Sequence, residues 1–146
     1  MKALVIAFAA IIAILLGVLL LVPSPKGQPS SAVAPTLSPD GHLEIDVPRA
    51  DDLALSPVAV EGKVTGGGWF FEASFPIKVL DGDGRILGSG TAQALSDWMS
   101  TGTVPFAASI HFTAPHFATG TILFQNDNPS GLPANQKSLS VPVRFR

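Results

Sequence analysis

Histidine is the first residue type in this sequence that could do chemistry. His42, His111 and His116 are its only histidines, and a hydrolytic triad would need one of them beside a serine and a carboxylate. Their spacing indicates no such arrangement: His111 alternates with apolar residues as a water-facing strand residue does, and His116 follows a proline. Phosphate-binding, serine-elbow and zinc-protease motifs are also missing. We therefore predict no catalytic residues and no enzyme activity.

A second candidate is the run Asp81-Gly82-Asp83-Gly84, whose carboxylates could bind calcium. Calcium takes six to eight oxygen ligands, and a complete loop continues with further acidic residues. Arg85 and Ile86 follow instead, so the composition favours a hairpin turn. The chain has no cysteine, which excludes thiolate metal sites and cysteine nucleophiles. The sequence thus predicts neither a metal nor a cofactor.

Recognition is the third possibility, and here the residue types are more informative. Tryptophan and methionine are common at binding surfaces, and Trp98-Met99 stands in a segment typical of a loop. A second polar cluster is Asn126-Asp127-Asn128. These five residues are the candidate ligand or partner contacts. Two alternatives stay open: Trp98 plugs the end of the core, and the Asn and Asp side chains cap backbone groups.

The elements that must position these residues are strands. The strongest pattern runs over residues 69–79, where Trp69 and Phe71 begin a period-two alternation that places Glu72 on the opposite face. Pro76 within it predicts an edge position or a bulge. Six further alternating stretches bring the total to seven strands, and they lie near residues 43–47, 58–64, 86–94, 106–113, 122–124 and 139–145.

Seven strands joined by short turns predict an all-β, antiparallel, immunoglobulin-like sandwich, with a single barrel as the alternative. In such a sandwich, alternate connections emerge at the same end. The connections near residues 65–68, 95–104 and 127–136 are therefore expected to meet, as the binding loops of variable immunoglobulin domains do. The segment that precedes the first strand is expected to enter at this end too.

The amino-terminal part predicts location. Residues 3–22 contain no charged residue and are long enough to cross a bilayer, which favours a transmembrane anchor over residues 1–22 rather than a cleaved signal peptide. Residues 23–41 are rich in proline and serine and predict an extended linker. Residues 42–146 form the predicted domain. We expect a single-pass membrane protein with this domain outside the cytoplasm.

Charge excludes one class of partner. The formal net charge is −2, and lysine and arginine form no cluster. A nucleic-acid-binding protein needs a basic surface, so nucleic acid is not an expected partner.

Several short runs resemble a known family in their order along the chain. They are residues 69–76, 81–84, 97–99, 105–106, 119–121 and 127–133, together with Gly90. The chain resembles the spore-germination-associated immunoglobulin-like domain of bacteria, which accompanies GerM domains in some proteins. The resemblance implies an immunoglobulin-like fold outside the cytoplasm, no known activity, and a role in adhesion or assembly. It supplies no catalytic residues, and no GerM domain is present here.

Together these observations predict an interaction or structural module of the bacterial cell envelope, anchored in the membrane through residues 3–22. Its expected partner is a protein or a cell-wall glycan. A domain that binds cell-wall polysaccharide is the alternative function, and it would need a tryptophan-bearing groove beside Asn and Asp side chains.

Overall fold

The computed structural model describes residues 34–66 and 68–146. The predicted anchor, residues 1–22, and most of the predicted linker lie outside these ranges, so both stay predictions. Within the described ranges, no helix is long and apolar enough to cross a membrane.

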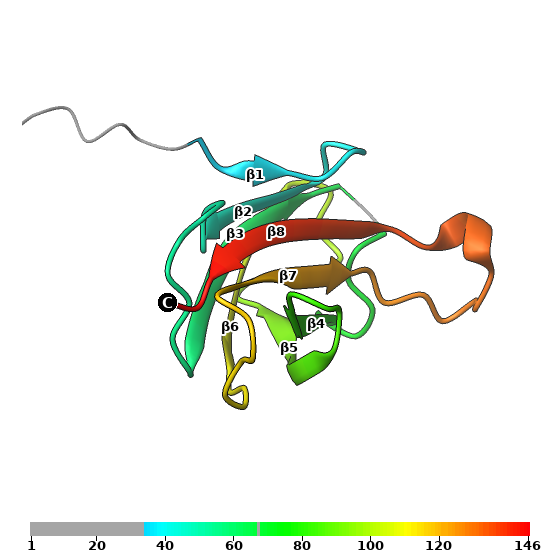
Figure 1. The fold of residues 1–146 in the computed structure, drawn as a ribbon. Helices are drawn as coiled ribbons and strands as arrows, with labels where there is room; N and C mark the ends of the chain where they lie inside the picture. The colour runs from blue at the N-terminus through cyan, green and yellow to red at the C-terminus, as the bar shows by residue number, and fades with distance from the viewer. Residues whose placement is uncertain (1–33, 67) are drawn as a thin grey trace, which may run out of the picture. The chain divides into compact units, whose positions relative to one another are not determined.

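Eight strands form one antiparallel sheet in the order β1-β2-β3-β6-β5-β4-β7-β8 (Figure 1). They are β1 (Thr36–Leu37), β2 (Leu43–Val47), β3 (Val58–Thr65), β4 (Ser74–Asp81), β5 (Ile86–Ala94), β6 (Thr103–Ile110), β7 (Thr119–Gln125) and β8 (Ser138–Arg144). A short 3-10 helix, η1 (Pro133–Asn135), precedes β8. The prediction of an all-β antiparallel domain is confirmed. The seven expected strands are present, and β1 is an eighth within the segment assigned to the linker.

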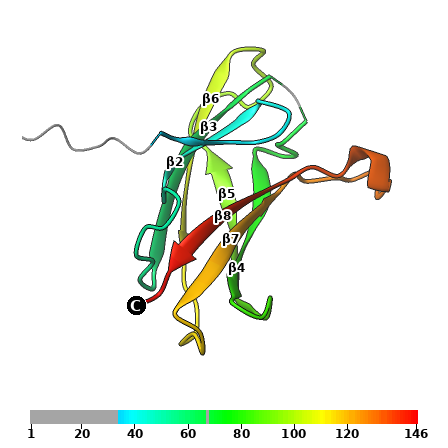
Figure 2. The same ribbon diagram turned by 45° about the horizontal axis from the view of Figure 1, so that its top comes forward.

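The sheet folds into two layers that enclose the core (Figure 2). One layer contains β2, β3 and β6, and the other contains β4, β7 and β8. β5 joins them, because it pairs with β4 along most of its length and with β6 only at Gln93 and Ala94. Strands such as β3 and β8 bury every second residue, as half-buried strands do. The largest fully buried side chain is Trp69, which packs against Phe75.

The strand predicted over residues 69–79 begins later than expected. β4 starts at Ser74, because Glu72 and Ala73 both adopt positive φ, 49° and 64°, and reverse the chain. Phe71 and Ser74 pair across this turn. Trp69 is consequently buried, whereas Phe71 is 40% exposed, so the prediction that both lie on one buried face was wrong.

Pro76 does not mark an edge strand. β4 lies inside the sheet, between β5 and β7. Pro76 pairs with Thr91 of β5, whereas the ladder with β7 starts one residue later at Ile77. The missing N–H of the proline therefore costs no hydrogen bond to β7.

The outer edge of β8 is partly covered by the connection between β2 and β3. The N–H of Asp51 donates to the carbonyl of Pro142 (2.9 Å), and the N–H of Ala54 donates to the carbonyl of Arg144 (2.8 Å). The N–H of Arg144 donates in return to the carbonyl of Asp52 (2.9 Å). These bonds add a short parallel segment to the sheet and nearly close it.

Candidate functional site

Three connections gather at one end of the sandwich, which we call the loop end. They are β3–β4, β5–β6 and β7–β8, and consecutive strands alternate in direction, so their connections reach the same end. The β3–β4 connection lies between the other two and borders a hollow with each of them. The arrangement expected from the sequence is thus the one observed. The β1–β2 turn also lies here, and β1 runs toward this end rather than away from it.

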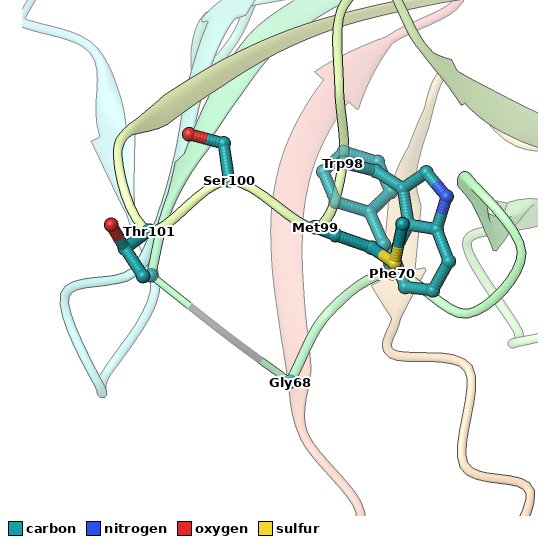
Figure 3. A pocket seen from close by; sticks show the side chains of 7 residues that line it. Gly68, Phe70, Trp98, Met99, Ser100 and Thr101 are labelled. Atoms are coloured by element: carbon teal, nitrogen blue, oxygen red, sulfur yellow. The ribbon is translucent and has the colours of Figure 1, made fainter.

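The first hollow has a volume of about 360 Å³ and lies between the β3–β4 and β5–β6 connections (Figure 3). Trp98 and Met99 line it together with Phe70, and the hydroxyl-bearing Ser100 and Thr101 stand at its other side. Met99 is 73% exposed. One side of the first hollow is therefore aromatic, and the other side carries hydroxyl groups.

A second hollow of about 420 Å³ lies between the β3–β4 and β7–β8 connections. It shares Gly68 and Phe70 with the first hollow, so the two depressions adjoin along the β3–β4 segment. Phe71 lines only the second one. We call the side chains of Phe70, Phe71, Trp98 and Met99 the loop-end surface.

Trp98 is half-buried and lies outside the core cluster of the described residues. Trp98 is thus not one of the buried residues that form the core. The tryptophan that fills this end of the core is Trp69, which has no exposed surface. Its indole Nε1–H donates to Oδ2 of Asp40 at 3.2 Å, so the polar edge of the buried ring is satisfied.

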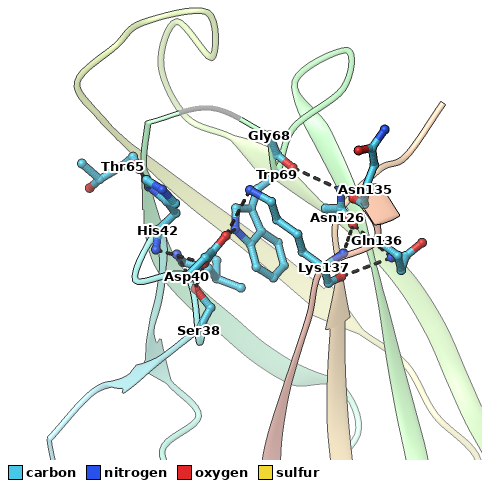
Figure 4. Close-up of polar contacts among 11 residues, drawn as sticks. Ser38, Asp40, His42, Thr65, Gly68, Trp69, Asn126, Asn135, Gln136 and Lys137 are labelled. Carbon is cyan, nitrogen blue, oxygen red and sulfur yellow. Dashed lines mark hydrogen bonds and ion pairs between the residues drawn. The ribbon is translucent and has the colours of Figure 1, made fainter. Parts of the chain in front are cut away.

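Asp40 fastens the β1–β2 turn to the rest of the loop end (Figure 4). Besides Trp69 it accepts from the Ser38 hydroxyl and the His42 N–H, and its Oδ2 lies 3.1 Å from Nζ of Lys137. Partial burial opposes ionisation, but these hydrogen bonds and the lysine charge outweigh it and hold the pKa of Asp40 well below its usual range. One carboxylate thus joins the start of β2, the core tryptophan and the start of β8.

Asn126 is a structural residue rather than an available ligand contact. Its side chain is buried, and its Nδ2 donates to the carbonyls of Gly68 (3.2 Å) and Asn135 (3.0 Å). Its Oδ1 accepts from the N–H of Lys137 (2.7 Å) and from Nε2 of Gln136 (3.0 Å). These four bonds use the whole amide and join the β7–β8 connection to the β3–β4 connection.

The other two polar candidates lie on the second hollow. Asn128 donates through Nδ2 to the carbonyl of Leu132 at 2.9 Å, so its side chain shapes its own loop. Asp127 is held by its backbone, whose N–H donates to the carbonyl of Trp69 at 3.1 Å. Of the three residues, only Asp127 has a side chain that makes no hydrogen bond to the described residues.

Phe70 and Phe71 are site residues that the sequence analysis missed, because both were assigned to a strand. The turn that follows them gives no signal in the sequence: positive φ is usual for glycine and asparagine, but here it occurs at Glu72 and Ala73. Two adjacent residues with positive φ, neither of them glycine, place strain on the backbone of this turn. The strained turn separates Phe71 from β4 and directs its ring to the loop end.

Relieving this strain gives a testable prediction. We expect the double substitution Glu72→Asn and Ala73→Gly to raise the free energy of unfolding by about 1 kcal/mol, because these residues adopt positive φ at lower cost. Urea unfolding followed by tryptophan fluorescence measures the change. Ala59→Gly on the exposed face of β3 is the matched control and is expected to destabilise. An unchanged or lower stability of the double variant would contradict the prediction.

At the opposite end, Asp81 holds the β6–β7 connection. Its buried carboxylate accepts from the N–H groups of His116 (2.9 Å) and Phe117 (3.1 Å) and pairs with Arg85 at 3.1 Å. The Asp81-Gly82-Asp83-Gly84 run is a hairpin turn between β4 and β5. In the described part of the chain, no group of three or more His, Cys, Asp or Glu residues could hold a metal ion.

The Asp81 contacts predict an acid-dependent loss of stability. Burial raises the pKa of Asp81, but the N–H groups of His116, Gly82 and Phe117 and the Arg85 guanidinium outweigh it and lower the pKa from 3.8 to about 2. A lowered carboxyl pKa stabilises the fold above the unfolded value, and this contribution is lost as the pH falls from about 4 to about 2. We expect Asp81→Asn to lose part of this pH dependence, which unfolding titrations at several pH values would measure.

Equal pH dependence of the variant and the natural chain between pH 4 and pH 2 would overturn this assignment. Asp40 contributes equally to the pH dependence of stability in both proteins. The difference between their pH dependences therefore comes from Asp81.

The three histidines are exposed and stand apart from any catalytic grouping in the described residues. His42 places Nδ1 2.6 Å from the carbonyl of Thr65, and His116 bonds Asp81 through its backbone N–H rather than its ring. His111 follows the last residue of β6. The prediction that the chain is not an enzyme stays a prediction.

A two-layered antiparallel sandwich whose alternate connections gather at one end is the architecture of immunoglobulin-like domains. The family model for the immunoglobulin-like domain of bacterial spore germination matches residues 42–131, and this chain belongs to that family. The resemblance proposed from the sequence is confirmed. No curated protein matches the chain, and no solved structure matches it.

Proposed function

We propose that this chain is an interaction module of the bacterial cell envelope, held in the membrane by residues 3–22, that binds a protein partner through the loop-end surface. The observation that carries the proposal is the exposure of large apolar side chains there: Met99 is 73% exposed and Phe71 is 40% exposed. Aromatic residues and methionine are enriched at protein interfaces, and contiguous exposed apolar surface often marks an interaction site.

The rigidity of the surroundings supports the same function. Asn126 and Asp40 fasten the β3–β4 connection, on which Phe70 and Phe71 of the loop-end surface lie. A surface held in place before binding loses less conformational entropy when a partner arrives.

The direction of β1 bears on how a tethered domain would present this surface. β1 runs antiparallel to β2, which starts at the loop end. The chain therefore enters β1 heading toward that end, and not at that end as the sequence analysis expected. In our proposal, the tether joins the domain at the start of β1 and not at the loop-end surface.

A cell-wall polysaccharide is the second candidate partner, and one observation favours it. Trp98 lines the first hollow together with the hydroxyl groups of Ser100 and Thr101. Sugar rings stack on aromatic faces and exchange hydrogen bonds with such groups. The amide of Asn126 is fully used inside the protein, however, and Asn128 is engaged within its own loop. The apolar character of the exposed side chains favours a protein.

Site-specific photo-crosslinking in the cells that make the protein tests the proposal. A photo-reactive amino acid at position 99 is expected to give a discrete protein adduct, whereas the same group at the exposed Thr91 of β5 gives none. The additional substitution Trp98→Ala should remove the adduct. Attachment to polydisperse wall polymer would support the glycan alternative, and equal labelling from both positions would contradict a binding role for the loop end.

A further inference from the structure

Carboxylates flank the loop-end surface on all three connections. Glu72 follows Phe71 at the tip of the strained turn, Asp97 precedes Trp98, and Asp127 lines the second hollow. Glu72 and Asp97 are exposed, and Asp127 is partly exposed. None of the three forms a salt bridge within the described residues, whose ion pairs involve Glu44, Asp81 and Asp40.

Among the described residues, Lys137 is the one basic residue that lines either hollow, and Lys78 donates to the Gln125 side chain at the end of β7. The Nζ of Lys137 lies 3.1 Å from Oδ2 of Asp40. Lys63 pairs with Glu44, and Arg85 pairs with Asp81 at the opposite end. The loop end is thus an apolar surface with an excess of negative charge.

Charge of one sign around an apolar surface selects a partner of the opposite sign. Complementary charge raises the association rate, and like charge at an interface costs free energy. Lysine and arginine suit this surface for a second reason, because their hydrocarbon stems pack on apolar side chains while the cationic head reaches outward. Phe70 and Trp98 also line the first hollow, and aromatic rings attract cations. The two chemical features of the loop end therefore point to one kind of ligand.

We propose that the partner is a protein that presents lysine or arginine next to a large apolar side chain. The apolar group enters the hollows beside Phe70, and the cation meets Glu72, Asp97 or Asp127. This inference rests on the proposed function and specifies the chemistry of the partner.

A phage-displayed library of random dodecapeptides tests the inference, panned against the full chain in nanodiscs of zwitterionic lipid. Selected peptides are expected to carry Lys or Arg within a few positions of Leu, Met, Phe or Trp. The test variant combines Glu72→Gln, Asp97→Asn and Asp127→Asn. Asp97→Asn keeps an oxygen for the bond that Asp97 accepts from the N–H of Met99. The matched control neutralises three exposed carboxylates away from the loop end, through Asp51→Asn, Glu61→Gln and Asp83→Asn.

We expect the test variant to bind the selected peptides about tenfold more weakly and the control variant to bind them within about twofold of the natural chain. Higher salt should weaken binding to the natural chain more than to the test variant. The proposal of a basic partner would be overturned if the selected peptides lacked basic residues. It would also be overturned if they bound the test variant and the natural chain with equal affinity. In that case, continued sensitivity to Trp98→Ala would leave the loop end as the binding surface. If no selected peptide responds to Trp98→Ala, the proposed function itself fails.

Discussion

Replacing Trp69 by alanine is expected to lower the free energy of unfolding by about 3 to 5 kcal/mol. A domain of this size has a total stability of about 5 to 15 kcal/mol, so the variant is expected to be largely unfolded at moderate temperature. Trp69 has no exposed surface and meets Phe75 edge-on at 6.0 Å between ring centres. Alanine would leave a cavity and would also leave Asp40 without its indole donor.

Trp98→Ala is the matched control, because these are the two tryptophans of the chain. Trp98 is half-buried and outside the core cluster, so its loss is expected to cost about 1 kcal/mol or less. Circular dichroism during thermal unfolding compares the two variants without relying on tryptophan fluorescence. Equal destabilisation by the two substitutions would mean that Trp98 belongs to the core and would weaken the argument for a binding surface.

The second large effect is expected from Gly62→Ala in β3. Gly62 lies between Ile45 of β2 and Phe106 of β6. A Cβ atom there would lie 2.2 Å from the carbonyl oxygen of Glu44 and 2.7 Å from Cζ of Phe106. Relief requires movement of the backbone of β2 and of a core ring, which is expected to cost about 3 kcal/mol. The preference of strands for alanine over glycine is worth less than about 1 kcal/mol and does not offset this.

Gly102→Ala provides the comparison, because the nearest atom to the added Cβ is the Ser100 hydroxyl at 3.3 Å. We expect a change within about 0.5 kcal/mol. Urea unfolding of both variants measures the difference. If Gly62→Ala were as stable as Gly102→Ala, β2 and β6 would have to approach β3 less closely than the structure shows.

Alternation predicts the strands of this domain well because one face of each strand is buried. β3 and β8 bury every second side chain, and their predicted positions agree with the structure within about one residue. The grouping of three connections at one end also follows from the sequence, since alternating strand directions suffice for it. Trp98 and Met99 were identified as residues of this end for the same reason.

The segment from Trp69 to Ser74 was not predictable from periodicity. Trp69 and Phe71 fit the alternation of the strand that follows, but Glu72 and Ala73 adopt positive φ without being glycine or asparagine. In the structure, Phe70 packs against Phe75 and Phe106 next to this turn. Tertiary contacts of this kind cannot be read from the period of the sequence. Phe70 and Phe71 therefore became visible as site residues only in three dimensions.

The role of Asn126 was hidden for a similar reason. A run of Asn and Asp residues indicates either exposed ligand contacts or caps for backbone groups, and composition does not separate the two. The structure separates them, because Asn126 meets carbonyl groups from two different connections. β1 was missed because a strand of two residues is too short to show a period.

The covering of the sheet edges has a consequence for self-association. An exposed edge strand offers unpaired N–H and C=O groups to which another molecule can add a strand, and this is a common route to aggregation. Here β1 pairs with β2 at one edge, and the residues after β2 pair with β8 at the other, where Pro142 also lacks an N–H. At these two edges, crowded copies of the domain therefore have little free main chain through which to add strands to one another.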